Sequence, residues 1–257
     1  MTVSVALPRV MPAVVPVVLA SAAVAQQIAY PLVGGPARDA LTVSVVVSLA
    51  AVAVTHAAVT RGGRFAMAML LVTGVPGFAA EVLGVHTGVP FGRYVYTGAL
   101  GPRWFGVPLV VGLAWTMLAW PAVLAAGTLA RSAAARVVVG AWTLAGTDLF
   151  LDPQLVHGGY WRWRDPSPHL PGVPSVPLSN LGGWLLVALL LSGALTWLVR
   201  GRGPADDRVP HTVFLWLYAG WVVALAGFGG QPAAAGWGAL ALAPVAAGVA
   251  AALLPRR

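Results

Sequence analysis

The sequence predicts an all-α membrane protein, a polytopic bundle of about eight transmembrane helices. Apolar residues make up 59% of the 257 residues, charged residues only 9%, and the mean hydropathy is +0.84. These values lie far from those of a water-soluble domain, so lipid is the expected solvent. Each helix needs roughly 20 apolar residues to cross the bilayer core. We therefore expect a single integral membrane domain over residues 1–257.

Uncharged apolar runs mark the predicted spans in order along the chain. They lie near 11–30, 40–60, 65–83, 106–130, 134–152, 181–200, 210–228 and 233–254. The first run follows Arg9 and contains Ala23-Val24-Ala25, a combination found in signal peptides. Because only one positive charge precedes a long apolar run, we expect an uncleaved first helix.

Arginines between the runs predict the topology. The side that holds both termini carries Arg9, Arg61, Arg64, Arg131, Arg136, Arg200, Arg202, Arg208, Arg256 and Arg257. The opposite side carries Arg38, Arg93, Arg103, Arg162 and Arg164. Because cytoplasmic loops are enriched in basic residues, both termini are expected in the cytoplasm of a multi-pass cell-membrane protein.

Missing residue types exclude several classes of protein. The formal net charge of +8 comes from arginine alone, because the chain contains no lysine. Retinal or pyridoxal Schiff bases and P-loops are therefore excluded. The absence of cysteine excludes disulfides and thiolate metal sites.

The arginines are scattered and form no stripe along one element, so no nucleic acid is expected as a partner. The lipid bilayer is the expected partner, and the oligomeric state, a homo-oligomer included, is left open.

Three carboxylates lie in or at the ends of predicted spans, where an ionised side chain is costly. Glu81 follows Pro76-Gly77, a pair that disrupts helices, and a kink there would turn Glu81 inward. The alternative is an ion pair between Glu81 and Arg93 or Arg103. Glu81 is therefore a functional candidate with a competing structural explanation.

Asp148 and Asp152 are four residues apart, which places both on one face of the fifth predicted helix. They are the second pair of functional candidates. Alternatively, Asp152 caps a short helix that begins at Pro153, and Asp148 makes a structural hydrogen bond. The remaining carboxylates are expected to be solvated or paired at the surface; they are Asp39, Asp165, Asp206 and Asp207.

Two long connections, 84–105 and 153–180, are rich in Gly, Pro, Tyr and Trp. Such aromatic residues form either an interfacial belt or a lid over a cavity between helices. His86 and His157 lie in these connections, but no metal-ligand spacing is present. Asn180 precedes the sixth predicted span and is a candidate either for the site or for a helix cap.

Three groups of segments between residues 70 and 190 resemble the membrane carotenoid hydratases of the CruF type, also described as bisanhydrobacterioruberin hydratases. They are Glu81–Gly84 with Pro90–Thr97; Leu100–Pro102 with Gly106–Leu109 and Trp115; and Asp148–Gln154 with Gly159–Trp163 and Pro177–Trp184. The chain departs from the family pattern at Val173–Val176, where a Tyr-rich stretch is expected.

This resemblance implies that water is added across the terminal 1,2 double bond of an acyclic carotenoid, of C40 or C50 length. The product is a tertiary alcohol, and no cofactor is needed. Such a reaction requires a carboxylic acid that is kept neutral by burial, for which Glu81 and Asp148 are candidates. Asp152 is then expected to orient the water and to accept its proton.

Aromatic faces can stabilise the tertiary cation formed in such a reaction. The aromatic candidates for substrate contact are Tyr94, Tyr96, Trp161 and Trp163, and the polar candidates are Asn180, His86 and His157.

Two other functions remain open on the sequence. Asp148 and Asp152 are a possible magnesium site of a membrane prenyltransferase, although the spans contain no second acidic cluster. In a non-enzymatic protein that binds carotenoid or lipid, the same polar residues would serve packing alone.

Overall fold

The computed structural model describes residues 10–255, and this part of the chain confirms the all-α prediction. Its helical elements are α1 (Val10–Ala29), η1 (Tyr30–Leu32), α2 (Gly35–Arg61), α3 (Gly63–Thr87), α4 (Val110–Leu129), α5 (Ala133–His157), α6 (Leu178–Val199), α7 (Arg208–Val223), the π-helical η2 (Ala224–Phe228) and α8 (Pro232–Leu253). Its strands are β1 (Tyr94–Tyr96), β2 (Arg103–Trp104), β3 (Val107–Pro108) and β4 (Trp161–Trp163).

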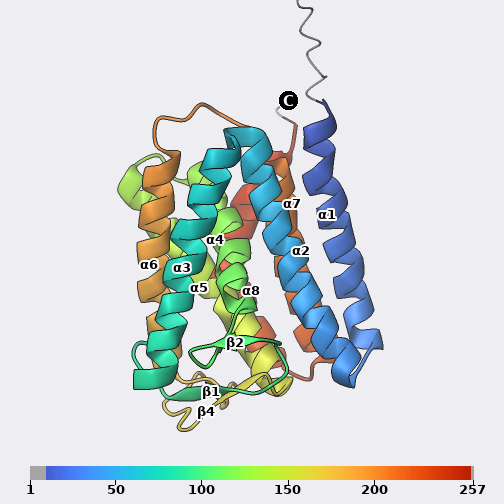
Figure 1. Cartoon of the computed structure of the whole chain (residues 1–257), viewed down its shortest axis with the longest axis vertical. Coiled ribbons are helices and arrows are strands. Elements are labelled where there is room, and N and C mark those ends of the chain that lie inside the picture. The colour runs from blue at the N-terminus through green and yellow to red at the C-terminus, as the bar shows by residue number, and fades with distance from the viewer. Residues whose placement is uncertain (1–9, 256–257) are drawn as a thin grey trace, which may run out of the picture.

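The bundle has two distinct ends (Figure 1). Among the described residues, eight helical segments are long and apolar enough to cross a membrane. The strands and long loops gather at one end, which we call the loop-rich end. The other, where α1 begins and α8 ends, is the arginine-rich end. Its connections and the adjoining helix ends carry Arg61, Arg64, Arg131, Arg136, Arg200, Arg202 and Arg208. Arg9, Arg256 and Arg257 lie outside the described residues, and the cytoplasmic location of the termini stays a prediction.

Helix α4 lies at the centre of the bundle. It packs against α2, α3, α5, α6, α7 and α8, and it is the most buried of the eight spans. α1 is the least buried and packs mainly on α2. α3, α5 and α6 therefore surround α4 and bring their polar residues to the bundle interior.

α3 and α5 extend further than the sequence predicts, and α2 and α6 begin earlier, at Gly35 and Leu178. α3 runs through Pro76 to Thr87, and α5 runs through Pro153 to His157. Asp152 therefore lies inside α5, and the prediction that it caps a short helix at Pro153 is wrong. A proline removes one N–H from a helix, a loss that surrounding protein can accommodate. α6 begins at Leu178 with Pro177 as its N-cap residue, so Asn180 is not the cap.

A two-stranded ribbon closes the loop-rich end. β1 pairs with β4 in antiparallel register, with Tyr94 opposite Trp163 and Tyr96 opposite Trp161. Alternate residues of a strand point to the same face, so these four aromatic side chains share one face of the ribbon. Val95 and Arg162 belong to the other face, and Arg162 is exposed.

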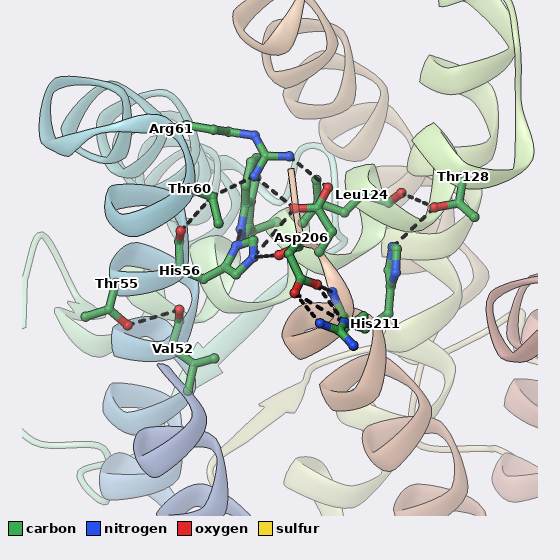
Figure 2. A network of polar contacts seen from close by, with 12 residues as sticks. Val52, Thr55, His56, Thr60, Arg61, Leu124, Thr128, Asp206 and His211 are labelled. Carbon is green, nitrogen blue, oxygen red and sulfur yellow. Dashed lines mark hydrogen bonds and ion pairs between the residues drawn. The ribbon is translucent and has the colours of Figure 1, made fainter. Parts of the chain in front are cut away.

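A polar cluster holds the α6–α7 connection onto α2 at the arginine-rich end (Figure 2). Arg61 makes two hydrogen bonds to the partly buried Asp207 carboxylate, of 2.9 and 2.8 Å. The Trp120 indole N–H donates to His56 Nδ1 at 3.2 Å, and His56 Nε2 lies 3.0 Å from the Asp206 carbonyl. Because an indole nitrogen only donates, His56 Nδ1 must accept and Nε2 carries the proton. The sequence predicted a solvated or paired surface carboxylate at Asp207, and the structure shows it paired with Arg61 but partly buried.

Replacing Arg61 by methionine is expected to lower the free energy of unfolding by about 2–3 kcal/mol, because it leaves the Asp207 carboxylate partly buried without a counter-charge. Denaturant titration in detergent measures this effect. Arg208→Met is the matched control, since Arg208 pairs with Asp206 at the exposed surface and little change is expected. Equal losses in the two variants would contradict the assigned role of Arg61.

Candidate active site

The main cavity lies at the loop-rich end, inside the bundle. Its open volume is ≈ 650 Å³, and its walls come from α2, α3, α4, α5, α6 and the β1–β4 ribbon. The lining is apolar and aromatic apart from a few polar groups, which are Thr42, Glu81, Asp152, Asn180 and the hydroxyls of Tyr94 and Tyr96. The structure thus brings residues from distant parts of the sequence to one enclosed space.

Glu81 is buried and held by three aromatic hydrogen-bond donors. The hydroxyls of Tyr94 and Tyr96 lie 2.5 and 2.8 Å from Glu81 Oε2. The Trp115 indole N–H donates to Glu81 Oε1 at 3.2 Å. Neither Arg93 nor Arg103 forms an ion pair with Glu81 among the described residues, so the predicted alternative of an arginine partner is wrong.

Two glycines of α3 allow these donors to approach Glu81. A Cβ at Gly77 would collide with the Trp115 side chain. A Cβ at Gly84 would come within 2.9 Å of the Tyr94 hydroxyl and 2.8 Å of Phe91. Any larger residue at either position would therefore displace a donor or the ring that supports it.

Asp148 and Asp152 lie side by side on α5, as their spacing predicts, and both are buried. The Asn180 side-chain nitrogen donates to Asp148 Oδ2 at 2.7 Å and also to Asp152 Oδ2. One amide group from α6 thus bridges two carboxyl groups of α5. Of the two, Asp152 lines the main cavity, whereas Asp148, one turn earlier on α5, lines a second pocket.

Seven aromatic residues line the cavity. Tyr94, Tyr96, Trp161 and Trp163 all line it, which places these predicted substrate contacts together. The rings of Tyr96 and Trp161 lie 5.5 Å apart between centroids, and those of Tyr94 and Trp163 lie 5.7 Å apart. The ribbon is therefore a lid over the cavity rather than only an interfacial belt.

Two tryptophans that the sequence prediction did not include in the site also line the cavity. Trp115 and Trp184 stack with ring centroids 4.2 Å apart. Both residues lie in the segments that carry the family resemblance, and this was the sequence signal that could have assigned them to the site. His86 and His157, in contrast, are exposed at the ends of α3 and α5 and do not line the cavity.

An amide group, rather than a third carboxylate or a histidine, lies beside the two aspartates of α5. Within residues 10–255, no group of three His, Cys, Asp or Glu side chains is arranged to hold a metal ion. The Asn180 amide nitrogen also donates to both aspartates. A hydrogen-bond donor therefore occupies the place that the prenyltransferase hypothesis assigns to magnesium.

Burial of the ribbon raises the pKa values of its two tyrosines. Burial raises the pKa of Tyr94, and the neighbouring Glu81 carboxyl group raises it further. The pKa of Tyr96 is raised by the same two causes in the same order. Both hydroxyls therefore keep their protons beyond the pH at which free tyrosine ionises.

Comparison with known proteins identifies relatives of this chain. The sequence profile of the family described as "Carotenoid biosynthesis protein" matches residues 41–251. A bisanhydrobacterioruberin hydratase from Haloarcula japonica is 34% identical over 122 residues, which cover 44% of this chain and 40% of that protein. The chain therefore aligns with less than half of the relative's length. No solved structure is significantly similar.

The raised pKa values predict an alkaline dependence of stability. Unfolded tyrosine ionises near pH 10. The contribution of Tyr94 and Tyr96 to the free energy of unfolding is therefore complete below about pH 10. It is lost above that pH, because the unfolded chain ionises first. Replacing both with phenylalanine should flatten this decline. Unfolding midpoints and phenolate absorbance across alkaline pH measure it. An unchanged pH dependence in the double variant would refute the expectation.

Proposed function

The chain belongs to the carotenoid biosynthesis protein family, and we propose that it adds water across the terminal 1,2 double bond of an acyclic carotenoid end group. One observation carries this proposal: two carboxyl groups, Glu81 and Asp152, face the same aromatic cavity. Hydration of an unactivated alkene needs a proton donor, a base for water and surroundings that tolerate a carbocation. The cavity offers all three.

Glu81 is the proton donor in this proposal. It is buried, accepts hydrogen bonds from two tyrosines and one tryptophan, and has no ion-pair partner among the described residues. Three hydrogen bonds fix its carboxyl group, so that it meets the substrate in one orientation. Transfer of its proton to C2 of the end group leaves a tertiary cation at C1.

The aromatic wall protects that cation until water arrives. Tyrosine and tryptophan rings attract a cation through their π faces without supplying a basic atom that removes a proton. Four of these rings lie on one face of the β1–β4 ribbon, and the stacked Trp115 and Trp184 add rings from α4 and α6 to the same wall. The cation would therefore be stabilised by rings from the ribbon and from two helices.

Asp152 is the base that orients water. The Asn180 amide, which also holds Asp148, fixes its carboxyl group at the cavity wall. The water oxygen bonds to C1, and Asp152 accepts one water proton as this bond forms. Return of a proton to Glu81 between turnovers restores the site, so the reaction consumes only water and forms a tertiary alcohol.

The substrate class rests on two further observations. The relative from Haloarcula japonica is named as a hydratase of a carotenoid, although the alignment covers 40% of its length. The cavity wall is almost entirely hydrocarbon outside the few polar groups, which suits the end of an isoprenoid chain. Residues from five helices and the ribbon would surround such an end group.

Expression in cells that produce acyclic carotenoids tests this function by mass spectrometry. The wild type should yield products heavier by one water. Glu81→Gln and Asp152→Asn should accumulate the unhydrated precursor, with hydration lowered roughly 100-fold or more, because each removes an acid or base. Asp165→Asn, at an exposed carboxyl group of the same end, should retain activity. Carotenoid binding without hydrated product from any acyclic end group would reject the proposal and favour a carrier.

A further inference from the structure

A second pocket lies at the loop-rich end, lined by residues of α5, the β4–α6 loop, α6 and α8. Its open volume is ≈ 330 Å³, and its lining includes Leu149, Pro153, Val173, Leu181 and Trp237. The Trp237 indole N–H donates to the Pro171 carbonyl at 3.0 Å and so fastens the β4–α6 loop to α8. This pocket shares no lining residue with the main cavity.

Three polar side chains connect the two spaces. Asp148 lines the second pocket, whereas Asp152 and Asn180 line the main cavity. The Asn180 amide donates to both carboxyl groups, so the three residues form one hydrogen-bonded unit. This unit is a polar link between two spaces whose walls are otherwise mostly apolar.

The second pocket has groups that need a small polar ligand. Asp148 Oδ1 is fully buried and has no hydrogen-bond partner among the described residues. Pro153 has no N–H to donate to the carbonyl of Leu149 one turn earlier, and both residues line the pocket. A water molecule bonds either acceptor, and buried water is held where two or more polar groups converge.

We propose that the second pocket binds water and supplies it, through Asp148, Asn180 and Asp152, to the reaction in the main cavity. This inference rests on the proposed hydration. A carotenoid chain that fills the apolar main cavity excludes water from that side. A separate aqueous route would deliver water directly to Asp152, its base. Asp148 is then a positioning residue that binds the arriving water.

Two leucines that lie one turn apart on α6 allow a matched test. Leu181 lines the second pocket, whereas Leu185, one turn further along, faces outward and lines neither space. Leu181→Trp narrows the pocket and should lower kcat roughly tenfold at an unchanged KM, because the cavity for the carotenoid is intact. Leu185→Trp should behave as the wild type.

Methanol gives a readout that does not depend on the amount of folded protein. It adds as water does: its oxygen bonds to C1, its hydroxyl proton passes to Asp152, and Glu81 supplies the proton at C2. If nucleophiles enter through the second pocket, the ratio of methyl ether to alcohol should fall in Leu181→Trp and rise in the widened Leu181→Ala. Leu185→Ala should keep the wild-type ratio.

The outcomes separate this inference from the proposed function. Absence of hydration by the wild type rejects the function itself. Hydration by the wild type, with the same kcat in Leu181→Trp and Leu185→Trp, overturns the water route. If Leu181→Trp does not fold, Leu181→Ala provides the test instead. An ether-to-alcohol ratio in Leu181→Ala equal to that in Leu185→Ala would also overturn the proposed water route.

Discussion

The Asn180 amide nitrogen holds two buried carboxyl groups against each other, and the organisation of the site depends on this contact. In an apolar bundle, polar groups must find their partners within the protein because lipid offers none. The bond joins α5 to α6 and fixes Asp152 in the cavity wall. The same requirement explains Glu81, whose carboxyl group is satisfied by aromatic donors instead of an arginine.

Neutral donors suit this site better than charged ones. An arginine beside Glu81 would add a positive charge where the proposed reaction forms another, and like charges repel strongly at low dielectric. Tyrosine and tryptophan donate a hydrogen bond from one edge and present a π face to the cavity. Among the described residues, the two arginine–aspartate pairs, Arg61–Asp207 and Arg208–Asp206, lie at the opposite end of the bundle.

The sequence predicted much of this arrangement because its signals are local. Apolar runs predicted eight spans. Because an ionised side chain is costly within a span, Glu81, Asp148 and Asp152 were predicted as functional candidates. Contacts between distant segments were harder to predict. Nothing in the spacing of Asp148 and Asp152 shows that only one of them reaches the cavity. Pro153 suggested a helix end, yet tertiary packing carries α5 past it. The role of Asp207 depends on Arg61, 146 residues earlier.

The pairing of β1 with β4 sets the order in which the cavity can be assembled during synthesis. Residues 94–96 are made before α4 and α5, whereas their partners, residues 161–163, follow both helices. Tyr94 and Tyr96 therefore emerge with Glu81 but have no partner strand until α5 has inserted. The lid is completed late, and any delay in the insertion of α5 leaves Glu81 in an unfinished and open site.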